Sequence, residues 1–250
     1  MDIWSLCDGA SHVGVITDDF VRIVESQQQI ATSQIVDNLE EQSILESLLD
    51  DSKPPLPERA QHLHYLLSTP FRYPPLMHGS RFGQRHECSL LYASKSLATL
   101  LAEASYYRFV FWRGMCAAPP ARQFITEHTV FGGRYYTEQG VQLQHAPFDH
   151  YTRELAHPAK YDVTQQLGNN MRAHGVEAIE YVSARDRERG INVALYTPEA
   201  LSVNEPLYAE LWLCSTSQSV VRFSSRGVKQ VYSFAIDDFY VDGELPTPAC

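Results

Sequence analysis

The sequence predicts an α+β fold with mostly antiparallel strands, a few helices and a helical N-terminal extension. Helical spacing of apolar residues is confined to a few segments, whereas short β-branched or alternating runs fill much of the rest. The last fifty residues alternate in the manner of an antiparallel sheet. The chain has 250 residues, 44% of them hydrophobic, which is enough for one well-packed core.

Residues 1–60 are predicted to form the helical extension, and residues 61–250 the main domain. Apolar residues recur at roughly helical spacing from about Asp18 to Asp51, and Asp18 or Asp19 suits an N-cap. The proline-rich segment 53–57 then stops any helix and indicates a short, stiff linker.

The middle of the chain mixes strands with one helix. Residues 62–73 are apolar and aromatic enough for a strand, and residues 89–93 indicate a short buried strand. Ser94 suits the N-cap of a helix that runs to about Phe111. The run 124–136 predicts a strand that is broken at Gly132 and Gly133.

The second half of the chain predicts one more helix and several paired strands. The helix runs from about Tyr161 to His174, with Gly175 as its C-cap. Strands are predicted on either side of the polar turn 185–190 and near the C-terminal end, over residues 178–182, 191–195, 211–214 and 220–223.

Charge and cysteine usage limit the class of protein. The formal net charge of −10 disfavours a nucleic-acid partner, because carboxylates repel a phosphate backbone. No signal-peptide core follows the first residues, and no apolar stretch reaches the roughly 18 residues of a membrane helix. The five cysteines are scattered, which indicates reduced thiols in the cytoplasm and no structural zinc.

Two arginines in one loop are candidate anion ligands. Arg72 precedes Tyr73, and Arg81 follows Gly79 and Ser80. A guanidinium donates two parallel charge-assisted hydrogen bonds to a phosphate, and a neighbouring glycine lets the backbone approach closely. The same pattern also fits two surface arginines in an ordinary turn.

Three further side chains are candidates for a catalytic or ligand-binding role. Glu103 lies at the margin of an apolar helix face, where a carboxylate can be aimed at a ligand or simply solvated. Tyr92 ends a buried strand, so its ring could stack on a planar heterocycle or belong to the core. Ser183 ends a predicted strand, where a hydroxyl faces a cleft or forms a turn.

Several common sites are excluded by their missing motifs. Ser183 lacks the G-x-S-x-G elbow of a serine hydrolase. No P-loop is present, and Gly132-Gly133 lacks a dinucleotide-binding context. The cluster of histidines with Cys88 between residues 62 and 88 has no paired zinc spacing, so no metal is predicted.

The order of these short motifs along the chain resembles that of the RES family, which is named for its arginine, glutamate and serine. The resemblance covers roughly residues 65–200. Its matching pieces are Phe71-Arg72-Tyr73, Gly79-Ser80-Arg81-Phe82, Leu91-Tyr92-Ala93-Ser94, Ala102-Glu103, Gln165 with Gly168, Gly175, Tyr181-Val182-Ser183-Ala184-Arg185 and Gly190-Ile191-Asn192-Val193-Ala194-Leu195.

The resemblance implies an ADP-ribosyltransferase-like fold in residues 61–250 and an enzyme that cleaves the nicotinamide–ribose bond of NAD+. NAD+ is then the substrate, and no separate cofactor is expected. Arg72 and Arg81 are implied to hold the phosphates, Tyr73 and Tyr92 to pack near the nicotinamide, and Glu103 and Ser183 to lie near its ribose. Gly79, Ser80 and Gln165 are expected to contribute to substrate binding.

The resemblance also implies a biological role and leaves alternatives open. Family members act as bacterial toxins that deplete NAD+, many of them neutralised by an Xre-like antitoxin, and a homodimer is a further expectation. The alternatives are an ADP-ribosyltransferase that modifies a protein and a catalytically inactive interaction module. Ser80, Phe82 and Gly83 depart from the family's usual glycine, tryptophan and asparagine, which changes the loop but keeps Arg81.

Overall fold

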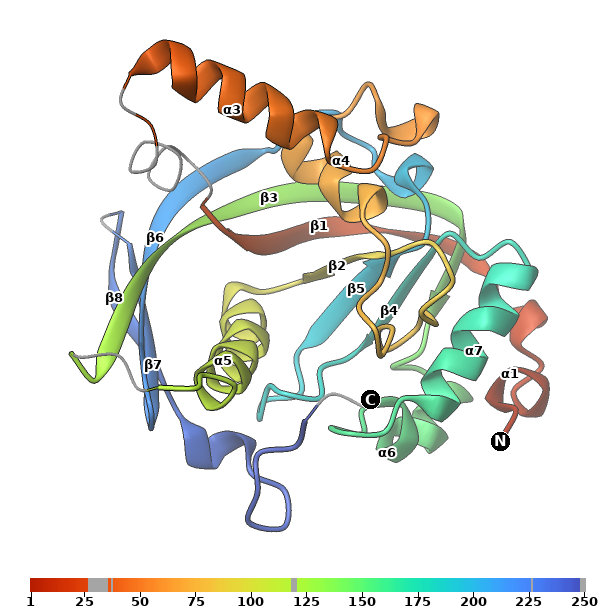
Figure 1. Ribbon diagram of the computed structural model, residues 1–250. Helices are drawn as coiled ribbons and strands as arrows, with labels where there is room; N and C mark the ends of the chain where they lie inside the picture. The colour runs from red at the N-terminus through yellow and green to blue at the C-terminus, as the bar shows by residue number, and fades with distance from the viewer. Residues whose placement is uncertain (27–35, 37, 118–120, 226, 248–250) are drawn as a thin grey trace.

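One sheet dominates the computed structural model of the chain (Figure 1). The structure describes residues 1–26, 36, 38–117, 121–225 and 227–247. Within these residues the sheet has eight strands, antiparallel to their neighbours except for the parallel pair β3 and β4. In order across the sheet they are β1 (Gly14–Glu25), β2 (Leu91–Ser94), β5 (Ile191–Leu195), β4 (Ala178–Val182), β3 (Gln123–Gln142), β6 (Tyr208–Ser217), β7 (Val220–Ser225) and β8 (Val228–Ala235).

Part of this sheet closes on itself. β1 pairs with β3 along most of its length and with β2 at a single position, Val21 opposite Ser94. Since β2 pairs with β5, β5 with β4, and β4 with the end of β3, these five strands form a ring. The weak β1–β2 contact is supplemented by the Arg22 side chain, whose Nη1 donates to the Tyr92 carbonyl at 3.2 Å.

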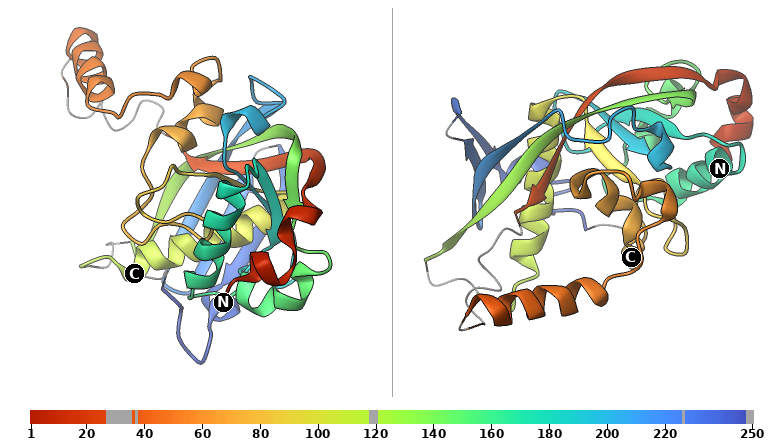
Figure 2. Two further views of the ribbon diagram at one scale, coloured as in Figure 1. Left: turned by 90° about the vertical axis from the view of Figure 1, so that its right-hand side faces the viewer. Right: turned by 90° about the horizontal axis from the view of Figure 1, so that it is seen from above.

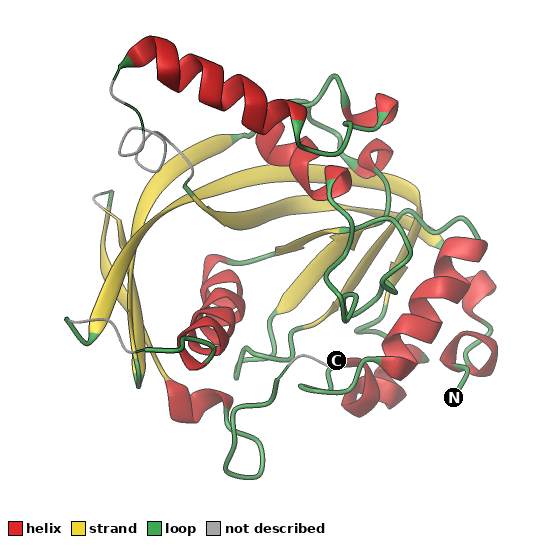
Figure 3. Ribbon diagram, viewed as in Figure 1, coloured by secondary structure: helices red, strands yellow, loops and turns green. Residues whose placement is uncertain are grey.

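The helices lie on both sides of the sheet. Figure 1 shows α5 in the concave side of the curved sheet, whereas α1, α6 and α7 gather near the other end. Figures 2 and 3 show α3 at the periphery, and its Leu39, Ile44 and Leu48 are exposed. The bounds are α1 (Ile3–Leu6), α3 (Leu39–Asp51), α4 (Tyr65–Arg72), α5 (Leu97–Arg113), α6 (Thr152–Leu155) and α7 (Asp162–Ala173).

Three groups of buried apolar side chains hold these layers together. The first lies between α1, α7 and the outer face of β4 and β5 and includes Trp4 and Met171. The second fills the strand ring under α4 and includes Phe20 and Leu67. The third packs α5 into the concave face and includes Trp212. Each fully buried large side chain contributes roughly 1.5–3 kcal/mol to folding.

A buried carboxylate, that of Glu180, lies inside the strand ring. Glu180 of β4 accepts hydrogen bonds from Tyr135, Gln142 and Gln144, and from Lys95, which also pairs with Asp18 of β1 at 2.7 Å. Burial raises the pKa of Glu180, but the donated hydrogen bonds and the Lys95 charge outweigh it and hold the pKa below its usual 4.5.

The helix predicted from about Asp18 is wrong in its first part. Residues 14–25 form β1, so residues 1–60 are not a purely helical extension. β-branched residues such as Ile16 and Ile23 favour a strand. Asp18, which suits an N-cap in the sequence, instead pairs with Lys95 beside the ring. The later part of the predicted helix does contain α3, and residues 27–35 and 37 lie outside the described residues.

The strand predicted over residues 62–73 is also wrong, because α4 occupies Tyr65–Arg72. His64 caps this helix, its Nδ1 accepting from the Leu66 amide at 3.3 Å. Leu67 and Phe71 lie one helical turn apart and both enter the core. A short apolar run does not distinguish strand from helix by periodicity, which explains the error.

The break predicted at Gly132-Gly133 is absent, since β3 runs through both residues. A Cβ at Gly132 would lie 2.4 Å from the Tyr208 ring, and one at Gly133 would lie 2.3 Å from the Phe20 ring. These glycines therefore make room for aromatic rings on a continuous strand.

Most other predicted elements are confirmed. The α+β class with a mainly antiparallel sheet is confirmed, as are strands 178–182 and 191–195. The helix predicted from Tyr161 to His174 is α7, and it is followed by Gly175 at φ +74. The predicted N-cap moves by two residues, because Ser96 rather than Ser94 accepts from the Thr99 amide and begins α5.

Candidate active site

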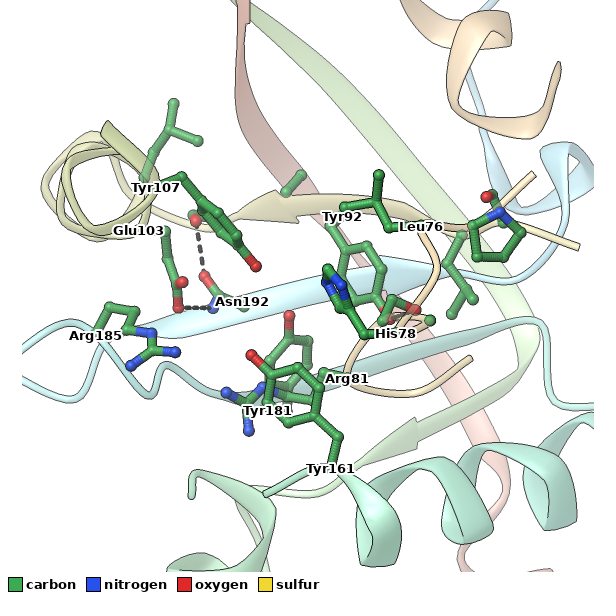
Figure 4. Close-up of a pocket in the computed structure, with 18 of the residues that line it drawn as sticks. Leu76, His78, Arg81, Tyr92, Glu103, Tyr107, Tyr161, Tyr181, Arg185 and Asn192 are labelled. Carbon is green, nitrogen blue, oxygen red and sulfur yellow. Dashed lines mark hydrogen bonds between the residues drawn. The ribbon is translucent and has the colours of Figure 1, made fainter. Parts of the chain in front are cut away.

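A cavity of about 360 Å³ opens where the strand ring meets α5 and the start of α7 (Figure 4). Its walls come from six stretches of the chain. The loop 74–81 forms one side, and the strands β2, β4 and β5 contribute Tyr92, Tyr181 and Asn192. Glu103 of α5 and Arg185, just after β4, lie close together in Figure 4.

Glu103 is the only carboxylate that lines this cavity within the described residues. Its Oε1 accepts one hydrogen bond from the Ser183 hydroxyl at 2.6 Å and another from Asn192 Nδ2 at 2.8 Å. Ser183 Oγ in turn accepts from the amides of Arg185 and Asp186, both at 3.1 Å. The Glu103 carboxylate is therefore held in one orientation by two donors on the same oxygen.

Two guanidinium groups supply positive charge to the cavity. Arg81 Nη1 donates to the carbonyls of Leu155 and His157 at 3.1 and 2.9 Å, and its guanidinium lies over the Tyr161 ring. Arg185 is buried, lies over the Tyr106 ring and donates from Nη2 to the Pro158 carbonyl. Within the described part of the chain, no carboxylate forms a salt bridge with either arginine, so both charges can serve an anionic ligand.

Tyrosines form much of the cavity wall. Burial raises the pKa of Tyr92 to about 12, and burial also raises the pKa of Tyr181 well above its usual value, with Tyr92 and Glu103 adding to the effect. Both hydroxyls therefore keep their protons at neutral pH. The Tyr92 hydroxyl donates to Ser80 Oγ at 2.8 Å and accepts from the Phe82 amide at 3.0 Å, which ties the loop to β2.

The loop that carries Arg81 is fixed from behind by α7. Gln165 Nε2 donates to the carbonyls of His78 and Ser80 at 3.1 and 3.0 Å. Gly79 has φ +72, a conformation that L side chains rarely adopt. A Cβ at Gly168 would lie 2.0 Å from the Phe82 carbonyl oxygen, so only glycine lets the helix approach the loop this closely.

The structure brings together most of the residues singled out in the sequence. Gly79, Ser80, Arg81, Tyr92 and Glu103 line the cavity. Two others, Ser183 and Gln165, lie just behind this wall.

Ser183 contacts Glu103 without lining the cavity, and Gln165 holds the loop through its backbone. Arg72 and Tyr73 do not line the cavity: Arg72 Nε donates to the Pro54 carbonyl, and Tyr73 is exposed at the end of α4. Arg72 is the last residue of α4 and Tyr73 is its C-cap, and neither belongs to the cavity wall that contains Arg81.

The family departures have specific structural consequences. Ser80 stands where the family usually has glycine and provides the hydroxyl that bonds Tyr92. Phe82 stands where tryptophan is usual and is fully buried, with its ring 4.8 Å from that of Tyr181. Phe82 therefore packs behind the cavity wall in the core and does not line the cavity.

Sequence reasoning missed several residues of the cavity wall. Arg185 and Asn192 belong to the segments that carry the family resemblance, but neither was assigned a role. Their position beside Glu103 depends on the pairing of β4 with β5, which sets Tyr181 opposite Asn192. Tyr107 lies one turn after Glu103 on α5, so helical spacing could have indicated it.

A family model for the RES domain matches residues 56–217, which is more than half of the chain. The chain belongs to the RES family. The match extends from the linker before α4 to the end of β6, and it includes every residue named above in the cavity wall.

The other comparisons add little to this assignment. No curated protein matches the chain. Among solved structures, a chain of the crystal structure of the M. tuberculosis MbcT-MbcA toxin–antitoxin complex is similar with 9% identity and a TM-score of 0.48, over 82% of this chain and 90% of that one.

The described residues also lack two kinds of feature. None of their helices is long and apolar enough to cross a membrane. No group of three or more histidine, cysteine or acidic side chains among them could hold a metal ion.

Proposed function

We propose that this RES-family protein consumes NAD+ by cleaving the bond between nicotinamide and ribose. The observation that carries the proposal is one oriented carboxylate, Glu103, in a tyrosine-lined cavity with two arginines that form no salt bridge to any carboxylate in the part of the chain that the structure describes. A dinucleotide that carries a pyrophosphate, a cationic glycosidic bond and two planar bases suits such a cavity.

Arg81 and Arg185 are the proposed ligands of the pyrophosphate. Each guanidinium has N–H groups besides those that donate to the carbonyls of Leu155, His157 and Pro158. A bound phosphate would accept charge-assisted hydrogen bonds from these remaining N–H groups. Arg185 replaces Arg72 in this role, since Arg72 does not line the cavity and its Nε donates to the Pro54 carbonyl. The aromatic rings of Tyr92 and Tyr181 offer apolar surface for the nicotinamide.

Glu103 is the proposed catalytic residue. When the C–N bond breaks, its electron pair leaves with neutral nicotinamide and positive charge develops on the ribose. A fixed carboxylate beside the sugar stabilises that charge more strongly in the transition state than in the ground state. The oxygen of water or phosphate then forms the new bond to the sugar carbon, and with water one proton is released.

Such an activity would deplete NAD+ in the cytoplasm and act as a toxin. The family resemblance supports a neutralising antitoxin of the Xre-like kind as the partner. A protein that covers the cavity, and so blocks the approach of NAD+ to Glu103, would be sufficient to inhibit it.

NAD+ consumption by the purified protein, with and without phosphate, tests the proposal. Chromatography should show NAD+ lost and nicotinamide released, and ADP-ribose or its phosphorylated form would name the acceptor. Tagged NAD+ distinguishes transfer from degradation, because label on protein with little free ADP-ribose would favour an ADP-ribosyltransferase. If NAD+ neither binds in calorimetry nor is consumed, the proposal is wrong.

A further inference from the structure

Glu103 has a second support that reaches it across two strands. Ser94 at the end of β2 donates from Oγ to Asn192 Oδ1 at 2.7 Å, and Asn192 Nδ2 donates to Glu103 Oε1 at 2.8 Å. Ser94 is 2% exposed and Asn192 is 3% exposed. The hydrogen bonds therefore run in one direction, from a buried hydroxyl through a buried amide to the carboxylate (Figure 4).

Sheet register makes this chain of contacts rigid. Ser94 and Asn192 are directly opposite in the antiparallel pair β2–β5, and Tyr181 of β4 is opposite Asn192 on its other side. Directly opposed residues project from the same face of a sheet, so the paired backbones hold the Ser94 and Asn192 side chains next to each other. Lys95, next to Ser94, is anchored by Asp18 and Glu180, which holds the end of β2.

The chemistry of the three groups determines which way the amide faces. An ionised carboxylate only accepts hydrogen bonds, so the amide nitrogen of Asn192 faces Glu103 and the amide oxygen faces the Ser94 hydroxyl. Both donors to Glu103, from Ser183 and Asn192, reach the same oxygen, Oε1. Oε2 takes part in no hydrogen bond within the described residues, and Glu103 lines the cavity.

We propose that Asn192, itself oriented by Ser94, is a positioning residue that fixes the Glu103 carboxylate toward the ribose of the substrate. The inference rests on the proposed function and assigns a role that the arginine, glutamate and serine of the family name leave out. Asn192 supports Glu103 from the sheet, whereas Ser183 supports it from the turn after β4. Together they prevent rotation of the carboxylate during the reaction.

The test compares kcat with KM for NAD+ in Asn192→Asp and Ser94→Ala. Asn192→Asp keeps the shape but replaces the donor with an oxygen, so Glu103 loses one bond and gains a repulsive neighbour. Misorientation of a catalytic group by about 1 Å can cost on the order of 100-fold. We expect kcat to fall about 10- to 100-fold in Asn192→Asp and less in Ser94→Ala, with KM changed less than threefold.

The double variant tests whether Ser94 acts through Asn192. If it does, adding Ser94→Ala to Asn192→Asp lowers kcat no further, because coupled residues are not additive. The exposed Asn204→Asp is the matched control and should keep the wild-type kcat. Thermal melting of each variant shows that it is folded, and Ser94→Ala decides the question if Asn192→Asp is unfolded.

Two results would overturn the inference while the wild-type enzyme consumes NAD+. One is an unchanged kcat in folded Asn192→Asp or, failing that, in Ser94→Ala. The other is a raised KM with kcat unchanged, which would make Asn192 a direct substrate ligand. A wild-type protein that does not consume NAD+ would instead refute the proposed function, and the inference with it.

Discussion

Replacing Glu103 with glutamine removes one negative charge from the cavity and little else. Glutamine keeps an oxygen that can accept from Ser183 and Asn192, so both supporting hydrogen bonds survive. What is lost is the attraction between the carboxylate and the positive charge that develops on the ribose. Two unit charges about 4 Å apart at an effective dielectric constant of about 20 attract by roughly 4 kcal/mol.

This magnitude sets the expected rate. Since each 1.36 kcal/mol corresponds to a factor of ten, Glu103→Gln should lower kcat for NAD+ cleavage by about 1,000-fold. KM and the melting temperature should change little, because the binding arginines and the hydrogen bonds are retained. Chromatography of nicotinamide release over hours gives enough range to measure such a loss.

A matched control separates charge at the site from charge in general. Glu127→Gln makes the same chemical change at an exposed position on β3 and should leave kcat unaltered. If folded Glu103→Gln keeps kcat within about tenfold of the wild type, electrostatic stabilisation by Glu103 is not the main catalytic effect and the reasoning fails.

Three more variants test the loop, the helix contact and the buried carboxylate. Arg81→Gln should lower kcat/KM for NAD+ by about 10- to 100-fold, since a hydrogen bond to a charged group is worth roughly 1.5–3 kcal/mol, and unchanged kinetics would exclude phosphate binding there. Gly168→Ala should destabilise the fold by about 1–3 kcal/mol in urea titrations, because its Cβ would meet backbone, whereas Gly14→Ala, with open space around it, should not. The depressed pKa of Glu180 stabilises the fold above about pH 4.5, and this stability is lost as pH falls through the folded-state pKa. In Glu180→Gln the unfolding free energy should therefore fall less steeply with pH in that acid range. Equal slopes of unfolding free energy against pH in the variant and the wild type would contradict this.

The fold could be predicted from sequence where one local signal was dominant. α7 has clear periodicity and a following glycine, and β4 and β5 are short apolar runs around a polar turn. β1 was mistaken for helix because Asp18 looked like a cap, and only its distant partner Lys95 explains that carboxylate. Pairing partners more than a hundred residues apart, as in β1 and β3, leave no local signal.

The candidate site could be predicted in part for the same reason. Arg81, Tyr92 and Glu103 lie in segments whose family resemblance is specific, and the structure places them around one cavity. Arg72 and Arg185 each neighbour polar or aromatic residues in sequence, so local pattern does not rank them. The choice depends on α4 being a helix and on the register of β4 with β5.

The strand ring also limits where the chain can be shortened. A fragment trimmed to the matched residues 56–217 would lack β1, β7 and β8, although it would keep every residue of the cavity wall. β3 and β6 would then each expose a row of unpaired N–H and C=O groups, which is a template for pairing between molecules. Such a fragment should self-associate on expression more readily than the full chain, so the stretch that carries the family signature is shorter than the stretch that pairs both edges of β3 and β6.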